Sequence, residues 1–244
     1  MYVHPFADEM NKARRMVALQ SRRMCEAGYA VLQMDLMGCG DSSGDFGDAT
    51  WEDWIEDVRS ACRWLGERTD APLWLWGLRA GCLLAADAAA TLERSKPSFL
   101  FWQPARSGKQ VLQQFLRFKA AGDLSEGNAK LVMAELRAQL AQGAAVDVVG
   151  YRLSAGVAAG LERAQLDPPG NAQRLEWLAV SSRASAGLTP SAERCLEAWR
   201  EAGVEGHAST VSGPAFWQTT DVEEAPELLD ATMRVLLEPE QQAA

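Results

Sequence analysis

The sequence predicts an α/β fold in which a mostly parallel sheet is covered by helices on both faces. Short apolar runs alternate with amphipathic stretches, and glycine-rich turns separate them, as expected for strands followed by helices. A long Ala/Leu/Gln-rich stretch then interrupts this alternation. The 244 residues therefore divide into a core of residues 1–105 and 171–244 and a helical cap insertion of residues 106–170.

Each element follows from its apolar pattern. Short runs rich in aliphatic and aromatic residues predict strands over 1–6, 29–36, 72–78, 97–104, 174–182 and 206–213. Apolar residues at helical spacing predict helices over 8–28, 50–69, 80–92, 189–203 and 223–238, with Thr50 as the N-cap of the second. The cap is expected to hold two or three helices and a short segment at 146–154.

Charge and cysteine content exclude several classes of function. Lys and Arg number 24 against 33 Asp and Glu, and the net charge of −9 disfavours binding to nucleic acid or to anionic lipid. The 5 cysteines form no CxxC pair, which favours reduced thiols over disulfides or a zinc site. Because no apolar run reaches membrane length and no signal pattern begins the chain, we expect a cytoplasmic protein without cofactor, metal or direct membrane insertion.

Three motifs point to one superfamily. Residues 75–83 read LWGLRAGCL, where Gly77 and Gly81 flank a sharp turn from strand to helix that larger side chains would obstruct. Residues 35–44 read DLMGCGDSSG, and His4-Pro5 ends the first predicted strand. In chain order, His4-Pro5, the loop at 35–44 and the turn at 75–83 resemble three motifs of the α/β-hydrolases: the oxyanion-hole segment, the D-x-x-G-x-G-x-S-x-G loop and the nucleophile elbow.

A narrower resemblance covers several long strings. The chain looks like the exosortase A system-associated hydrolases of type two in HPFADEMNKARRM, DLMGCGDSSGDFGDATWEDWIEDV, LWLWGLRAG, LFWQPARSGKQ and GPAFWQTTD. This resemblance implies an α/β-hydrolase fold in a bacterial protein of an exopolysaccharide or exosortase-associated system, with a protein partner from that system.

The positions of a Ser-His-Asp triad do not carry that chemistry. Arg79 stands at the nucleophile position, and its guanidinium is a permanent cation without a usable lone pair. The loop at 213–218 has no histidine, and residues 181–183 read SSR, without a carboxylate. His207 lies at the start of the last predicted strand, whereas sites in parallel sheets lie beyond the carboxyl ends. The sequence therefore leaves open whether the chain is an enzyme and favours a pseudoenzyme.

Substitute catalysts define an alternative hypothesis. A hydrolase or acyltransferase acting on ester or thioester bonds would use Cys39 or Ser42 as the nucleophile, with His4 as the base. Cys82 follows Arg79 by one helical turn and is expected to face the sheet. The other interpretation of His4 is hydrogen-bonded support for the neighbouring loop.

The elbow has the electrostatics of an anion site. Amides at the start of a helix favour anions, and the forked guanidinium of Arg79 suits a carboxylate or a phosphate. We expect a ligand-binding pocket for an anionic small molecule or a peptide carboxylate at this sheet edge, formed by His4, Phe6, Leu78, Arg79, Trp102, Gln103 and Trp217. Two other interpretations stay open: an internal acidic residue pairs with Arg79 and plugs the site, or the chain is a structural adaptor that uses its cap.

The beginning of the chain departs from the superfamily pattern. α/β-hydrolases usually have an antiparallel hairpin before the strand that ends in the oxyanion-hole segment, and this sequence begins at that strand. Either the start has been misassigned or the first two strands are absent. In the second case the strand at 29–36 is expected to form an unprotected sheet edge, open to pairing with another chain.

Overall fold

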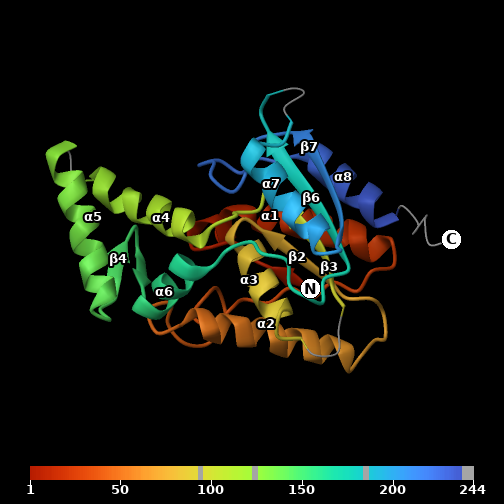
Figure 1. The fold of residues 1–244 in the computed structure, drawn as a ribbon, viewed down its shortest axis with the longest axis horizontal. Coiled ribbons are helices and arrows are strands. Elements are labelled where there is room, and N and C mark those ends of the chain that lie inside the picture. Colours follow the sequence, from red (N-terminus) through yellow and green to blue (C-terminus); the bar gives the residue numbers. More distant parts are fainter. Residues whose placement is uncertain (93–95, 123–125, 184–186, 238–244) are drawn as a thin grey trace.

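A five-stranded parallel sheet forms the centre of the molecule (Figure 1). The computed structural model describes residues 1–92, 96–122, 126–183 and 187–237. Sheet order is β1-β2-β3-β6-β7, and each neighbouring pair is parallel. The strands are β1 (Tyr2–Val3), β2 (Trp74–Leu78), β3 (Ser98–Trp102), β6 (Arg174–Ser181) and β7 (Glu205–Ser212). The parallel sheet predicted from the alternating apolar runs is confirmed.

Helices cover both faces of this sheet and create two hydrophobic cores. On one face α2 (Trp51–Gly66), α3 (Ala80–Ala89) and α7 (Pro190–Glu201) contribute to the larger core. On the other face α1 (Asp8–Glu26) and α8 (Pro226–Leu237) contribute to the second. Alternating strand residues supply the two cores, as Leu75 and Trp76 do. None of the described helices is both long and apolar enough to cross a membrane.

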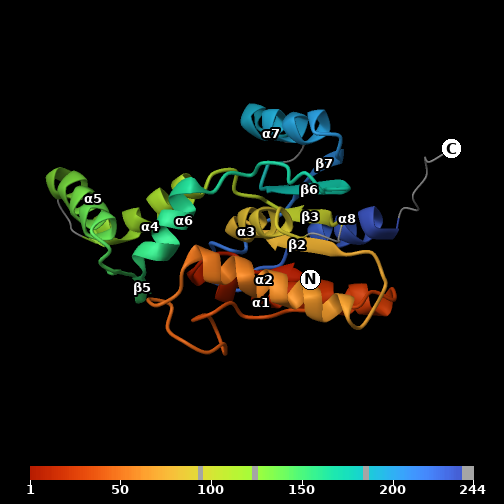
Figure 2. The same ribbon diagram turned by 60° about the horizontal axis from the view of Figure 1, so that its bottom comes forward.

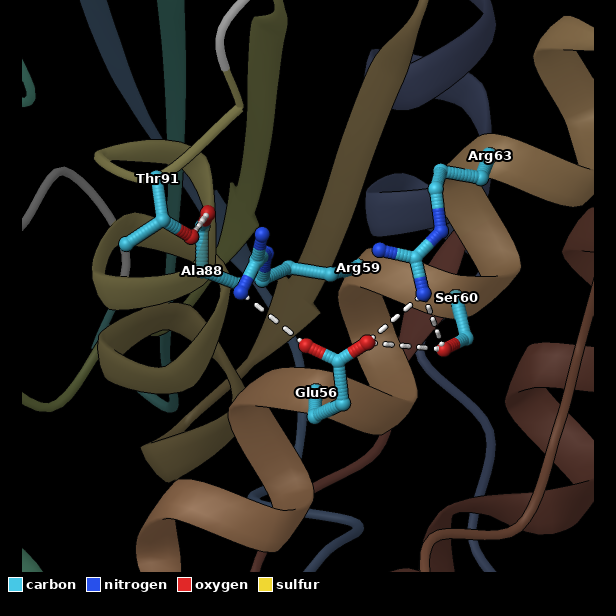
Figure 3. Close-up of polar contacts among 6 residues, drawn as sticks. All are labelled: Glu56, Arg59, Ser60, Arg63, Ala88 and Thr91. Atoms are coloured by element: carbon cyan, nitrogen blue, oxygen red, sulfur yellow. Dashed lines mark hydrogen bonds and ion pairs between the residues drawn. The ribbon is translucent and has the colours of Figure 1, made fainter.

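Local signals determine how α2 begins and what its outer face looks like. The Thr50 hydroxyl accepts from the Asp53 backbone N–H at 3.1 Å, and the Asp53 carboxylate accepts from the Thr50 backbone N–H at 2.9 Å. The N-cap predicted at Thr50 is therefore confirmed. On the exposed face, Glu56 accepts from Arg59 at 3.0 Å and from Arg63 at 2.6 Å (Figure 3). This face therefore carries solvent-exposed ion pairs.

Residues 29–36 differ from the prediction of a full strand. The structure has an isolated parallel bridge between Gln33 and Tyr2, and the Tyr2 N–H donates to the Leu32 carbonyl at 2.8 Å. The ladder is short because β1 has two residues and is followed closely by Pro5, which has no N–H to donate. On its outer side this segment pairs with no strand in the described part of the chain, and pairing with another chain at this edge stays a prediction.

Residues 106–170 project to one side of the sheet in both ribbon views (Figures 1 and 2). They contain α4 (Gly108–Gly122), α5 (Glu126–Ala141), the hairpin of β4 (Val146–Val148) and β5 (Tyr151–Leu153), and α6 (Ala155–Arg163). α6 lies against α2, because a Cβ on Gly160 would come within 2.0 Å of the Trp51 Cβ. The hairpin is the form taken by the segment predicted at 146–154. Treatment of this region as a separate cap domain stays a prediction.

Two glycines let α3 approach the sheet closely. A Cβ on Gly77 would lie 2.8 Å from the Cys82 backbone nitrogen, and a Cβ on Gly81 would lie 2.3 Å from the Val3 carbonyl oxygen. Real Cβ atoms do not tolerate such distances to backbone, so any larger residue would push α3 away from β1 and β2. These glycines set the position of the turn between β2 and α3.

We therefore expect Gly81→Ala to lower the free energy of unfolding by about 1–3 kcal/mol, the usual cost of overpacking a core. Gly66→Ala is the matched control, because nothing lies within 4 Å of the position that its Cβ would take. That change should be neutral or stabilise by up to about 1 kcal/mol, as alanine does in a helix. Urea unfolding of both variants measures the difference, and equal stabilities would contradict the close approach of α3.

Candidate functional site

The turn from β2 into α3 is centred on Arg79. Its backbone has φ 55° and ψ −118°, in a region that residues other than glycine rarely adopt. The Arg79 N–H donates to the Trp102 carbonyl at 3.1 Å, and the Ala105 N–H donates to the Arg79 carbonyl at 3.1 Å. The turn has the strained geometry expected of a nucleophile elbow, with an arginine at the central position.

Backbone strain marks the same edge of the sheet at two further residues. Ala7 has φ 52° just before α1, and Gln103 has φ 42° just after β3. β1 and β3 are the two neighbours of β2, so these residues follow three adjacent parallel strands. Such strain persists only where the surrounding structure enforces it, and it concentrates at functional sites. The carboxyl ends of β1, β2 and β3 therefore define the candidate site.

The guanidinium of Arg79 is paired within the protein. Its Nε lies 3.4 Å from Oε1 of Glu9, and the two side chains are 17% and 16% exposed. The ring of Trp217 lies 5.8 Å from the Arg79 Cζ, and Gln218 forms a hydrogen bond to the Glu9 carboxylate. We call Glu9, Arg79, Trp217 and Gln218 the elbow cluster. Its members come from the start of α1, the elbow itself and the loop after β7.

Burial decides the electrostatics of this cluster. Removal from water raises the pKa of Glu9, while the charge of Arg79 and the hydrogen bonds from Arg79 and Gln218 act in the opposite direction. A carboxylate thus occupies the place at Arg79 where an anionic ligand would bind. This is the arrangement that the plug interpretation describes, and binding of an external anion stays a prediction.

A small cavity lies beside the elbow. The cavity between residues 4–7 and the start of α3 has a volume of about 10 Å³, room for one water molecule at most. Phe6 lines it and packs edge-to-face against Phe115 at 4.9 Å and Trp54 at 6.2 Å. An acyl group does not fit here unless these aromatic side chains move.

The seven predicted pocket residues reach one sheet edge but lie on two sides of it. His4 and Phe6 line the small cavity on the α2 side, whereas Leu78, Trp102 and Trp217 are part of the core beneath α1 and α8. A common pocket for all seven residues stays a prediction. Across this division, the Arg79 guanidinium lies 5.8 Å from the Trp217 ring.

Two of these residues have structural partners instead. Trp102 is fully buried, and its Nε1–H donates to the Thr232 hydroxyl at 2.9 Å. The Gln103 Oε1 accepts from the Val180 backbone N–H at 2.7 Å, which fastens the end of β3 to β6. Both side chains position the sheet edge rather than line a cavity.

His4 is engaged at both ring nitrogens. Its Nδ1–H donates to the Pro5 carbonyl at 2.8 Å, and its Nε2 accepts from the Leu36 N–H at 3.2 Å. These bonds identify the neutral tautomer with the proton on Nδ1, and burial lowers the pKa of the ring. In this conformation neither nitrogen is available to act as a base, and the ring supports the loop that begins after Gln33.

The alternative nucleophiles are also poorly placed. Cys82 is fully buried with its Sγ 4.0 Å from the Trp102 carbonyl, and burial raises the pKa of its thiol well above the usual range. Burial and the Asp35 charge raise the pKa of Cys39 to about 12. The thiols of Cys82 and Cys39 therefore stay protonated at neutral pH.

His207 lies near the start of β7, with its Nδ1 3.1 Å from the Glu176 Oε1.

Glu9 and Gln218 were not among the residues predicted from the sequence. Each follows the carboxyl end of a strand by a few positions, Glu9 after β1 and Gln218 after β7. Carboxyl ends of parallel strands meet at one edge, so an acidic residue shortly after β1 was a candidate partner for Arg79. That signal, applied to the first turn of α1, would have found Glu9.

The buried His4 ring predicts a dependence of stability on pH. Its pKa in the folded state lies below the ordinary value of 6.5, so below that pH the unfolded chain binds more protons than the folded one. The free energy of unfolding should therefore fall as the pH drops below about 6.5, by at most about 1.4 kcal/mol per pH unit. Urea unfolding between pH 7.5 and 5 should show a smaller change of unfolding free energy with pH in His4→Asn than in the unaltered protein. Glu9 contributes equally in the two proteins, so it does not affect the comparison. The same pH dependence in both would contradict the prediction.

Comparison with known proteins places this geometry in a structural context. No protein-family model matches the chain, and no curated protein sequence matches it.

Solved structures match over most of its length. Est1E from Butyrivibrio proteoclasticus, determined with ferulic acid bound, matches with a TM-score of 0.62 at 16% identity over 92% of this chain and 82% of that one. The α/β hydrolase GrgF from Penicillium sp. sh18 gives a TM-score of 0.55 at 17% identity, over 91% and 83%. Mouse α/β hydrolase domain-containing protein 10 gives 0.55 at 14%, over 96% and 88%. At such identities the likeness concerns the fold alone, and it shows that this chain has the α/β-hydrolase fold.

Proposed function

We propose that this chain is an α/β-hydrolase-fold protein without hydrolytic activity that binds an anionic group at Arg79. We place it in a bacterial exopolysaccharide or exosortase-associated system, on the sequence resemblance described above. The observation that carries the proposal is the ion pair between Arg79 and Glu9 at 3.4 Å, located where a hydrolase would carry its nucleophile. The ligand is a small molecule or a peptide that presents a carboxylate or a similar anion.

Several observations support the absence of hydrolysis. The elbow carries a cation in place of a nucleophile, and the loop after β7 brings Trp217 and Gln218 to the elbow in place of a histidine. His4 is held at both nitrogens, and the Cys39 thiol has a pKa of about 12. Acyl transfer requires an activated nucleophile next to a base, and these groups do not supply one.

The same cluster supports anion binding. A guanidinium is suited to bidentate recognition of carboxylate, and Trp217 offers an aromatic surface beside it. The Glu9 carboxylate is disfavoured by its removal from water, as its raised pKa indicates. A ligand carboxylate that takes its place would release Glu9 toward solvent. Glu9 and an external anion thus compete for the same guanidinium, and Arg79 is plugged when Glu9 binds it and is a ligand site when the external anion does.

Removal of the internal ligand tests this proposal. Glu9→Gln should bind benzoate at least about tenfold more tightly than the unaltered protein, because a competing charged hydrogen bond of roughly 1.5 kcal/mol is gone. Arg79→Met should abolish binding. Quenching of tryptophan fluorescence during titration reports the event, since Trp217 lies beside the guanidinium. Asp8→Asn is the matched control: Asp8 is also in the first turn of α1 but pairs with Lys12 at 2.9 Å. An equal gain in Asp8→Asn and Glu9→Gln would refute a specific site at Arg79.

Covalent probes test the alternative, a hydrolase that uses Cys39 or Ser42. His4 and Cys39 do line the same small cavity. We expect neither a fluorophosphonate nor iodoacetamide to label one residue stoichiometrically in the native protein. The iodoacetamide experiment uses a Cys25→Ser background, because Cys25 is exposed. Stoichiometric labelling of Cys39 or Ser42 with loss of ester hydrolysis would replace the noncatalytic proposal with the alternative.

A further inference from the structure

Basic residues concentrate on α1 although the whole chain is acidic. The net charge is −9, yet residues 10–25 contain five basic side chains and no Asp or Glu. The apolar side of this helix is buried against α8 and the sheet through residues such as Met16 and Val17. The basic side chains therefore project from the opposite side, which faces solvent.

A groove runs along this side of α1. It has a volume of about 690 Å³, within the usual range of roughly 300–1,000 Å³ for ligand sites. Lys12, Arg15, Leu19 and Arg22 recur every three or four residues, so they form one row along the helix. The opposite wall consists of Val222, which is 72% exposed, and Glu224. The groove thus combines a row of cations with aliphatic surface.

The protein already places one peptide carboxylate in this groove. Glu224 belongs to the segment at 221–225, which reads DVEEA, and its Oε1 lies 2.5 Å from the Arg15 Nε. Farther along the row, Arg22 is exposed and forms no ion pair with a carboxylate of the described residues. Two cations of the row are thus paired, Lys12 with Asp8 and Arg15 with Glu224, whereas Arg22 has no carboxylate partner in the described part of the chain.

We propose that this groove binds a short acidic peptide segment of a partner protein, with carboxylates at Arg15 and Arg22 and an aliphatic side chain over Leu19. Charge complementarity defines the occupant, and the internal segment at 221–225 shows how such a peptide is held. The two cations lie two helical turns apart, so the peptide presents two carboxylates on either side of an aliphatic residue. The site is independent of the elbow cluster and of the function proposed for it.

The surrounding charges favour a peptide over a polyanion. Four of the basic residues on this helix lie beside a carboxylate: Lys12 by Asp8, Arg14 by Asp35, Arg15 by Glu224 and Arg23 by Asp230. Nucleic acid or an anionic bilayer presents a continuous negative surface, which these carboxylates would repel. A short peptide needs only two cations: Arg15, where its carboxylate replaces that of Glu224, and Arg22, which has no carboxylate partner among the described residues.

Fluorescence polarisation tests the groove with a fluorescein-labelled hexapeptide of alternating glutamate and leucine. Arg22→Gln and Arg15→Gln should each weaken binding at least about fivefold, and Glu224→Gln should tighten it by a similar factor because the internal competitor loses its charge. Arg63→Gln is the matched control on α2 (Figure 3): Arg63 is 55% exposed and lies 2.6 Å from Glu56, against 58% and 2.5 Å for Arg15 and Glu224. It should leave the affinity unchanged.

Other probes separate the remaining outcomes. A peptide with lysine in place of glutamate should not bind, and Arg79→Met should not alter binding of the acidic peptide, which distinguishes this site from the elbow. Equal losses in Arg22→Gln and Arg63→Gln would overturn the proposal. Tighter binding of single-stranded DNA or of phosphatidylserine vesicles, lost in Arg22→Gln, would overturn the assignment to a peptide. Circular dichroism confirms that each variant is folded.

Discussion

The close approach of α3 to β1 and β2 constrains everything at the carboxyl edge of the sheet. Gly81 lies against the backbone carbonyls of Val3 and His4, so α3 begins directly over the end of β1. The chain must then leave β2 through a single strained residue, and hydrogen bonds from the end of β3 hold that residue in place. A side chain at position 79 is consequently directed toward the space between three strand ends. The scaffold determines where residue 79 lies, and the residue type determines what happens there.

An arginine in this position creates a requirement that a serine does not. A cation with 17% of its side chain exposed loses most of its hydration and needs a nearby acceptor. Glu9 is that acceptor. Because β1 has only two residues and the chain turns sharply at Ala7, α1 begins at the same sheet edge, with Glu9 in its first turn. The pair is costly to break from one side only, since either partner alone would leave an unpaired charge. The residue types at positions 79 and 9 are therefore coupled, because each charge needs the other as its partner.

Local signals predicted those parts of the molecule whose cause is local. Gly77 and Gly81 identified the elbow because a sharp turn with close packing excludes other residues, and Thr50 identified the start of α2 through its side-chain cap. The strand predicted at 29–36 failed because a strand also needs a partner, and two residues of β1 provide one bridge. At the sheet edge, strand ends predicted that Arg79 and Trp217 lie near each other, as they do. The other predicted residues are divided between the two faces of the sheet. That division depends on side-chain packing, which the positions of the strand ends do not reveal.

The segment after β7 shows how the two proposed surfaces are connected within one fold. Its first part supplies Trp217 and Gln218 to the elbow cluster, and its later part supplies Glu224 to the groove on α1. Between them, the Lys12 ammonium donates to the Gln218 carbonyl at 3.4 Å. α1 thus carries an acidic residue at its start that meets the elbow arginine and basic residues farther along that meet an acidic loop. Polar contacts from α1 therefore hold this segment near both ends, at Gln218 and at Glu224, and each of the two surfaces contains an internal carboxylate paired with an arginine.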